Sequence, residues 1–357
     1  MGSKRKINVG NVEIGGGAPV VIQSMTMSLT HDVEKVVPEI KELETEGCEI
    51  IRVSVPDKAS VEALPSILKN ISIPLIADIH FDHKLAIASI EAGVHCVRIN
   101  PGNIGSDEKV RAVIEAAKRK NTALRIGVNG GSLEKDLLEK YGYPMSEALV
   151  ESALRHVELC EKEKFFNFKI SIKSSDVKTM VKSYRLLASK VDYPLHLGVT
   201  EAGPVLPGSI KTALAFGALL MEGIGDTIRV SLTADSREEI KTAKIILKSL
   251  GLRVFGADII ACPSCARAEV DVVALANRVE KAVAHIKTPM KIAVMGCAVN
   301  GPGEASEAHV GIACGKKEGL LYLGGETLKK VPEEKLFQAL MDQVEKIEEK
   351  EQKALNV

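Results

Sequence analysis

Hydrophobic and polar residues follow two alternating patterns along the first 250 positions of the chain. Short runs rich in valine, isoleucine and leucine are each followed by a longer stretch whose apolar residues recur every three or four positions, as in an amphipathic helix. The short runs predict eight β-strands, at residues 19–26, 49–55, 74–80, 94–100, 123–129, 168–175, 193–201 and 226–232. Eight strands that alternate with helices are typical of a closed parallel (β/α)8 barrel of the TIM type. An open doubly wound sheet is the alternative, but no G-x-G-x-x-G sequence follows the first strand, which disfavours a dinucleotide-binding fold.

The pattern changes after the eighth predicted helix, at 236–250. The remaining residues predict strands at 253–261, 291–295, 308–314 and 319–325, a helix at 269–286, and a charge-rich final helix from about residue 332. We interpret the charged face of that last helix as solvated surface. The α/β chain is therefore expected to have two domains: a barrel at 1–250 that binds substrate and a small α+β domain at 251–357.

Charge and composition exclude several classes of protein. The 357 residues include 47 Lys and Arg against 47 Asp and Glu, which argues against a general nucleic-acid or anionic-membrane surface. No apolar run reaches the roughly 20 residues of a membrane span, and the basic start of the chain lacks the apolar stretch of a signal peptide. We therefore expect a cytoplasmic protein that binds neither nucleic acid nor membrane.

Cationic side chains recur near the carboxyl ends of the predicted strands. Residues two apart on a strand share a face, and the following residues share a face in this way: Arg52 with Ser54, Arg98 with Asn100, Arg125 with Asn129, Lys169 with Ser171 and Lys173, and Arg229 with Ser231. Barrel enzymes carry their sites at this end. Several cations that point inward there are costly without an anion, so the pattern predicts a pocket for phosphate or diphosphate. The alternative is that some of these Arg and Lys side chains form ion pairs with Asp78, Glu201 or Asp226 and have only a structural role in closing the barrel.

Three further barrel residues are candidates for proton handling. Asp78 and His80 share a face in "ADIHFDH", and we favour substrate hydrogen bonding or proton transfer over half a divalent-metal site, because no second ligand cluster accompanies them. Glu201 in "GVTEAGP" follows the seventh strand and is a candidate acid or base near the ligand. Its alternative role is to cap the next helix.

Cysteines supply a second candidate site. Seven cysteines in a chain of this size do not suggest a disulfide scaffold, and we interpret Cys48, Cys96 and Cys160 as buried packing residues. The others fall in two motifs, "CPSCAR" and "GCAVNGPGEA", which offer Cys262, Cys265 and Cys297 as soft ligands, and in a later strand that carries Cys314.

Three kinds of site use such a pattern. Structural zinc would need a second C-x-x-C or a pair of histidines, and a redox dithiol would leave Cys297 unexplained. An iron–sulfur cluster accepts a C-x-x-C with a distant third cysteine and a fourth ligand from elsewhere. That fourth ligand is either Cys314 or Glu304, and an oxygen ligand would make one iron distinct and more open to substrate. A phosphate-binding barrel with a structural zinc module remains the alternative function.

The motifs together resemble the hydroxymethylbutenyl diphosphate synthase family. The resemblance rests on the two cysteine motifs and on "ADIHF", "RINPGNIG", "RIGVN", "SIKSS", "VTEAG" and "RVSLT", and it covers nearly the whole chain. It implies a shorter, bacterial type of chain, without the middle domain inserted in the plant-type form.

The resemblance also implies an activity. Members of the family open and reductively dehydroxylate 2-C-methyl-D-erythritol 2,4-cyclodiphosphate to (E)-4-hydroxy-3-methylbut-2-enyl diphosphate, a step of isoprenoid biosynthesis. The two electrons arrive singly, from ferredoxin or flavodoxin, through a [4Fe-4S] cluster. In this chain the resemblance assigns the cluster to Cys262, Cys265, Cys297 and Glu304. It assigns substrate contacts to Arg52, Asp78, His80, Arg98, Asn100, Arg125, Asn129, Lys173, Arg229 and Ser231, and proton handling to Glu201.

The order of the domains raises a geometric problem. The eighth barrel helix runs on the order of 20 Å away from the mouth of the barrel, so the second domain is tethered at the opposite end. A head-to-tail homodimer, in which each second domain covers the partner's barrel, is the simplest solution, and the resemblance supports it.

Overall fold

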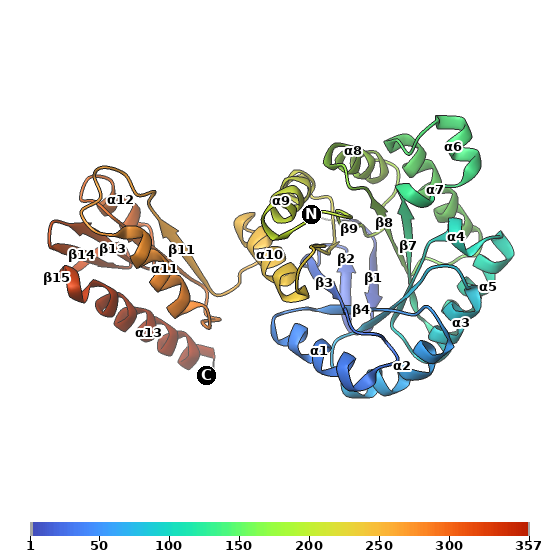
Figure 1. Ribbon diagram of the computed structural model, residues 1–357, viewed down its shortest axis with the longest axis horizontal. Helices are drawn as coiled ribbons and strands as arrows, with labels where there is room; N and C mark the ends of the chain where they lie inside the picture. The colour runs from blue at the N-terminus through green and yellow to red at the C-terminus, as the bar shows by residue number, and fades with distance from the viewer. Residues whose placement is uncertain (1–2, 356–357) are drawn as a thin grey trace. The chain divides into compact units, whose positions relative to one another are not determined.

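A computed structural model describes residues 3–355 of the protein, apart from the side chains at 101–102, 352 and 354–355. Contacts within the chain divide it into two compact units, Met1–Arg253 and Val254–Val357 (Figure 1). Among the described residues, no helix has both the length and the apolar character needed to cross a membrane.

The first unit is a barrel of eight parallel strands. They are β3 (Val21–Met25), β4 (Ile50–Ser54), β5 (Leu75–Ile79), β6 (Cys96–Ile99), β7 (Ala123–Asn129), β8 (Phe168–Lys173), β9 (His196–Leu197) and β10 (Thr227–Ile228). Their order in the sheet is β8-β7-β6-β5-β4-β3-β10-β9, and a parallel bridge between Ile170 and Leu195 joins the first strand to the last. The predicted TIM-type barrel is confirmed, the doubly wound alternative is wrong, and every strand lies within its predicted range.

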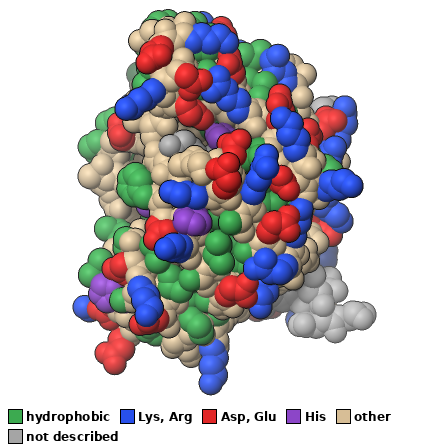
Figure 2. All heavy atoms as spheres, turned by 90° about the vertical axis from the view of Figure 1, so that its right-hand side faces the viewer, with side chains coloured by type: hydrophobic (Ala, Val, Ile, Leu, Met, Phe, Trp, Pro, Cys, Tyr) green, Lys and Arg blue, Asp and Glu red, His purple; other side chains and the backbone are tan. Residues whose placement is uncertain are grey.

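Helices surround the strands on the outside (Figure 1). They are α1 (Val33–Thr45), α2 (Lys58–Asn70), α3 (His83–Glu91), α5 (Asp107–Lys120), α7 (Ser146–Lys162), α8 (Val177–Ala188), α9 (Val205–Leu220) and α10 (Ser236–Ser249), with the shorter α4 (Pro101–Ile104), η1 (Gly130–Ser132) and α6 (Lys135–Tyr141) between β6 and α7. Several begin at an aspartate that caps the first turn: Asp57 accepts a hydrogen bond from the Ser60 N–H at 2.8 Å and Asp176 from the Thr179 N–H at 2.7 Å. The outer surface on the side of α3 to α6 mixes acidic and basic side chains without a large patch of one sign (Figure 2).

A hairpin with one buried apolar face closes the amino-terminal end of the barrel. The sequence patterns did not predict its strands, β1 (Lys6–Val9) and β2 (Val12–Gly15). Its side chains Ile7, Val9 and Ile14 pack with buried residues at the starts of the barrel strands, namely Val21, Ile50, Ile76, Cys96 and Ala123. The opposite end, where the cationic residues lie, is therefore the end at which a ligand can enter.

The second unit is a five-stranded sheet with helices. Its strands, in sheet order, are β11 (Ala257–Ala261), β12 (Met290–Met295), β13 (Val310–Gly315), β14 (Glu318–Leu323) and β15 (Glu326–Pro332), of which the first three are parallel and the last two antiparallel to their neighbours. Its helices are α11 (Val272–Val283), the short α12 (Gly301–Ser306) and η2 (Glu333–Lys335), and α13 (Leu336–Leu355). The predictions missed β15 and placed α12 in a loop.

The hydrophobic core of this unit contains one side of helix α13 and the side chain of Cys314. Leu336, Leu340 and Val344 of α13 are buried in it, so this helix is solvated on its charged side only. Cys314 belongs to the same core and is fully buried. Cys48, Cys96 and Cys160 are buried in the barrel unit, as the sequence predicted.

Candidate active site

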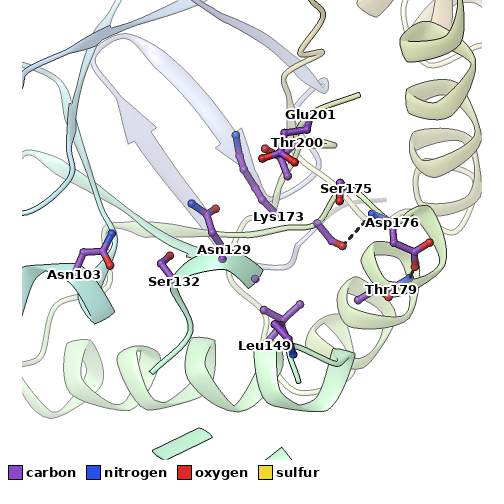
Figure 3. A pocket seen from close by; sticks show the side chains of 14 residues that line it. Asn103, Asn129, Ser132, Leu149, Lys173, Ser175, Asp176, Thr179, Thr200 and Glu201 are labelled. Atoms are coloured by element: carbon purple, nitrogen blue, oxygen red, sulfur yellow. Dashed lines mark hydrogen bonds between the residues drawn. The ribbon is translucent and has the colours of Figure 1, made fainter. Parts of the chain in front are cut away.

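A cavity of about 650 Å³ opens at the carboxyl ends of β7 and β8. Asn129 and Lys173 end these two strands as register partners, and Thr200 and Glu201 follow β9 on the cavity wall. Figure 3 shows Asn129 and Lys173 extending in the same direction, beside Thr200 and Glu201. Three of the predicted site residues, Asn129, Lys173 and Glu201, therefore line one cavity.

Asp78 organises two of the arginines beneath this opening. Its Oδ1 atom lies 3.1 Å from Nη1 of Arg98, and its Oδ2 atom lies 3.5 Å from Nη1 of Arg52. Burial opposes ionisation of the carboxyl, but the attraction of Arg52, Arg98 and Arg125 outweighs it and holds the pKa of Asp78 well below its usual range. Asp78 is therefore an ionised counter-charge for the arginines at neutral pH.

A second buried carboxylate, Glu239, is the counter-charge of Arg229, and the sequence predictions missed it. Glu239 lies in the first turn of α10 and is 5% exposed. It accepts hydrogen bonds from the Leu232 N–H at 3.0 Å and from Ser24 at 3.4 Å, and one of its oxygens lies 3.7 Å from Nε of Arg229. Glu239 thus ties the segment that carries Arg229 and Ser231 to strand β3.

Other cations in the barrel have no such partner. Arg125 and Lys169 are register partners on β7 and β8, and both are fully buried. Within the described part of the chain, none of the three guanidinium nitrogens of Arg125 has a hydrogen-bond partner, nor has the ammonium group of Lys169. Burial lowers the pKa of Arg125 to about 10 and that of Lys169 to about 8. Unpartnered buried cations of this kind indicate a place for an anion.

Two amides complete the inner rim. Asn100 donates a hydrogen bond from Nδ2 to the Ser132 hydroxyl at 2.6 Å. Asn129, with its amide in the orientation that satisfies both neighbours, accepts from Nη2 of Arg98 at 3.1 Å. Arg98 fits here because residue 127 is glycine: a Cβ atom at that position would come within 2.6 Å of Nε of Arg98.

His80 and Glu201 lie nearer to solvent. The His80 side chain is 45% exposed, with Nε2 3.7 Å from Oδ2 of Asp78. Glu201 is exposed and has a φ of +54°, a left-handed conformation that is costly for a residue with a side chain. This conformation lies at the cavity wall, where such strain is commonly functional. Glu201 does not cap α9, because Pro204 occupies the capping position.

The cysteine motifs meet in the second unit. They follow β11 and β12, which are parallel neighbours, so both loops leave the same edge of the sheet. A cavity of about 250 Å³ lies between them, and its walls include Cys262, Cys265, Arg267, Cys297 and Glu304. All four predicted cluster ligands therefore border one small cavity, and Cys314 does not.

Backbone groups around this cavity favour thiolates. The Gly296 N–H donates to Sγ of Cys262 at 3.1 Å. Backbone N–H groups of Asn300 and Val299 lower the pKa of Cys297, and the backbone and side chain of Arg267 lower that of Cys265. This environment fits a negatively charged sulfur-ligated group.

The candidate donors border the cavity from both cysteine loops. Among the residues that the structure describes, no three His, Cys, Asp or Glu side chains converge as a single ion requires. Zinc would need its ligands within about 2.3 Å of one point. A four-iron cluster binds each ligand at a different iron, so donors spread around a cavity fit such a group.

Comparison with known proteins identifies the family. The model of the GcpE TIM-barrel domain matches residues 4–244, and that of the GcpE protein C-terminal domain matches residues 258–346. The chain belongs to the GcpE family.

Members of the family are similar to this chain over almost their whole length. A protein of Caldanaerobacter subterraneus subsp. tengcongensis is 53% identical over 347 residues, which cover 97% of this chain and 98% of that protein. One of Geobacillus thermodenitrificans is 52% identical, with 97% and 92% covered. Both carry the name 4-hydroxy-3-methylbut-2-en-1-yl diphosphate synthase (flavodoxin), which confirms the resemblance found in the sequence. Among solved structures, a Yersinia pestis dihydropteroate synthase matches 70% of this chain at 14% identity with a TM-score of 0.49, too weak a likeness to inform function.

Proposed function

We propose that this protein performs the reaction for which its GcpE relatives are named. It would open 2-C-methyl-D-erythritol 2,4-cyclodiphosphate and release (E)-4-hydroxy-3-methylbut-2-enyl diphosphate, with flavodoxin or ferredoxin as electron donor. In this reaction a ring carbon–oxygen bond to phosphate breaks, two electrons enter, and a hydroxyl group takes up a proton and leaves as water. The observation that carries the proposal is the 53% identity, across both units, to a relative of that name.

The barrel would bind the diphosphate. Arg125 supports this role most strongly, because a fully buried guanidinium group without a partner among the described residues needs an anion. The other proposed contacts are Arg52, Asp78, His80, Arg98, Asn100, Asn129, Lys173, Arg229 and Ser231. Two buried carboxylates, Asp78 and Glu239, hold three of the arginines before substrate arrives. Substrate binding would therefore cost little side-chain entropy at these arginines.

Glu201 would supply or accept the proton at the reacting end of the substrate. It borders the same cavity as Lys173, and no hydrogen bond engages its carboxylate among the described residues. Asp78 is less suited to proton transfer, because its neighbours keep it ionised. We assign Asp78 to positioning and leave His80 as a second proton-handling group beside it.

The second unit would hold a [4Fe-4S] cluster on Cys262, Cys265, Cys297 and Glu304. When bound, a cluster of this type supplies electrons one at a time, and a carboxylate ligand leaves one iron more open than a thiolate does. Backbone N–H groups lower the pKa of Cys297, and the backbone and side chain of Arg267 lower the pKa of Cys265, which would favour the thiolate forms that bind iron.

A head-to-tail homodimer would bring the two sites together. The chain leaves the barrel at Arg253, which donates to the Val20 carbonyl at 2.8 Å and pairs with Glu49 at 3.1 Å. Val20 and Glu49 directly precede β3 and β4, at the end of the barrel opposite the cavity. The tether therefore starts far from the mouth of its own barrel, which supports a cluster unit that serves the partner's mouth.

Oxygen-free purification tests the cofactor and the reaction. The protein is expected to be brown, to contain iron and acid-labile sulfide, to give an EPR signal on reduction, and to turn over the cyclic diphosphate with reduced flavodoxin. A colourless protein with one tightly bound zinc would instead support the alternative function. Shared sites are tested by mixing a Cys297→Ala variant with a Glu201→Gln variant, each inactive alone. Recovered activity supports the dimer, and none would count against it.

A further inference from the structure

The side chain of Met25 lies against the guanidinium group of Arg52. The two residues are register partners on the neighbouring strands β3 and β4. The Sδ atom of Met25 accepts hydrogen bonds from Nη2 of Arg52 at 2.9 Å and from Nε at 3.2 Å. These two nitrogens form the edge of the guanidinium group that presents two N–H groups side by side. An uncharged thioether therefore covers the edge of Arg52 that best fits two oxygens of a phosphate group.

Sulfur is an unusual partner for an arginine of this barrel. Arg98 and Arg229 face the carboxylates of Asp78 and Glu239. Arg52 is 5% exposed, and its Nη1 atom lies 3.5 Å from Asp78, which is longer than an ordinary hydrogen bond. A thioether sulfur is neutral and only a weak acceptor. Arg52 is thus fixed in direction by a contact that a charged oxygen can readily replace.

The side of the guanidinium group that faces Met25 is the side that a ligand can reach. Met25 is the last residue of β3, at the end of the barrel where the ligand enters, and its side chain is only partly buried. Asp78, which faces Nη1, has a side chain that is 3% exposed. Methionine is unbranched and flexible, so the sulfur can move aside by rotation of the side chain alone.

The backbone at Met25 is held while its side chain is free to rotate. The Ser236 hydroxyl, at the start of α10, donates a hydrogen bond to the Met25 carbonyl at 3.1 Å. The N–H group of the next residue, Thr26, donates to the Arg52 carbonyl at 3.1 Å. Both bonds keep the end of β3 beside β4, so the sulfur returns to the same place when no ligand is bound.

We propose that Met25 is a positioning residue for phosphate binding: its sulfur holds Arg52 in the ligand-free protein and moves aside when two phosphate oxygens take its place on Nε and Nη2. A stronger acceptor at position 25 would compete with the ligand. A side chain without an acceptor would leave the guanidinium group free to turn, and the ligand would then have to order it. This inference rests on the proposed function, which assigns Arg52 to the diphosphate, and adds a residue that the proposed contacts do not include.

Two substitutions on either side of methionine in acceptor strength test this role. Met25→Leu removes the acceptor, and Met25→Gln supplies an amide oxygen on a chain of similar length. With the full chain purified without oxygen, calorimetry should show inorganic pyrophosphate bound about 5-fold more weakly by Met25→Leu and about 10-fold more weakly by Met25→Gln. Turnover of the cyclic diphosphate should show a larger change in KM than in kcat. Met27→Leu and Met27→Gln are the matched controls, because Met27 is 72% exposed two residues further on, and both should bind as wild type does.

The NMR signal of the Arg52 Nε–H group separates positioning from packing. In protein labelled with ¹⁵N-arginine, the signal is identified by its loss in Arg52→Lys. It should be sharp and protected from exchange with water in ligand-free wild type and in Met25→Gln, exchange faster in Met25→Leu, and become protected again when pyrophosphate binds. Unchanged pyrophosphate binding in both Met25 variants, or an Arg52 signal in Met25→Leu that matches wild type, would overturn the role of Met25 and leave the proposed function intact. A wild-type protein that binds neither pyrophosphate nor the cyclic diphosphate would overturn both.

Discussion

The Oδ1 atom of Asp78 lies 3.1 Å from Nη1 of Arg98, and the two side chains are 3% and 5% exposed. This buried pair lets cations of like charge lie close together in the barrel before any ligand is bound. It also fixes the direction of the Arg98 guanidinium group, which reaches Asn129 on the cavity wall. Asp78 therefore acts on the ligand through the arginines that it holds.

Asp78→Asn should lower the free energy of unfolding by about 3 kcal/mol, because it leaves two buried arginines without their counter-charge. The acid has a lowered pKa in the folded protein. Its contribution is therefore present above the pKa of an unfolded aspartate, about 4, and is lost as the pH falls through and below that value. Urea unfolding at pH 7 measures the loss of unfolding free energy in Asp78→Asn. Urea unfolding at pH 3 to 4 measures how much of the difference between wild type and variant disappears in acid.

Asp192→Asn is the control for this change, because Asp192 pairs with Lys4 at the surface and is 52% exposed. It should have little effect at either pH. An Asp78→Asn variant as stable as wild type at pH 7 would contradict the assigned role.

Glu239→Gln should weaken diphosphate binding and leave the fold largely intact. The glutamine oxygen can still accept from the Leu232 N–H, but the charge opposite Arg229 is lost, so that the guanidinium group is no longer held in place. We expect about a 10-fold weaker dissociation constant for inorganic pyrophosphate by calorimetry, and a KM that changes more than kcat.

Glu238→Gln is the matched control, since Glu238 is the preceding residue on α10 and pairs at 2.8 Å with Lys241 on the surface. Equal effects of the two substitutions would mean that Glu239 has no special part in holding Arg229.

The strand pattern predicted the barrel because each strand is a short apolar run between polar loops. The phase of Arg52, Arg98 and Arg229 also indicated the cationic end, since alternate residues of a strand share a face. Glu239 was missed because it looks like an ordinary acidic residue of a first helical turn. The available signal was that Glu239 lies four residues before Ala243, which places both on the buried side of α10.

Other misses have local causes. The hairpin of β1 and β2 has only four residues in each strand, too few for a period to stand out. Strand β15 is exposed at almost every position and so lacks alternation. The Gly-Pro-Gly start of α12 is typical of a loop, and the local sequence does not reveal that Gly301 packs so closely that a Cβ atom there would lie 3.1 Å from the Cβ atoms of Met295 and Ala313.

Lys169→Met should stabilise the ligand-free protein at neutral pH. Burial lowers the pKa of this lysine to about 8, against 10.5 for the exposed side chain. Between these values the unfolded chain binds a proton that the folded protein does not, so the stability of wild type rises with pH there. Lys169→Met has no buried ammonium group and so avoids the cost of keeping one charged. We expect its free energy of unfolding to exceed that of wild type by about 3 kcal/mol at pH 7, and this difference to disappear by about pH 10.

Urea unfolding across this pH range measures the difference. Lys162→Met, at a lysine that is 70% exposed, should show no such trend. A constant difference between Lys169→Met and wild type at all pH values would mean that the buried ammonium group is already paired in the folded protein.

Glu304→Ala should lose more iron than Cys314→Ala. Glu304 borders the cavity shared by Cys262, Cys265 and Cys297, whereas Cys314 is fully buried in the core formed with α13. After oxygen-free gel filtration, Glu304→Ala should therefore retain less iron and sulfide per chain than wild type. Cys314→Ala should keep wild-type content and show only a lower unfolding midpoint, because it leaves a small cavity in the core. Glu304→Gln, which preserves the size of the side chain, separates loss of the carboxylate from loss of packing. Equal iron loss in Glu304→Ala and Cys314→Ala would contradict the ligand assignment, because two such differently placed side chains can act alike only through the stability of the unit as a whole.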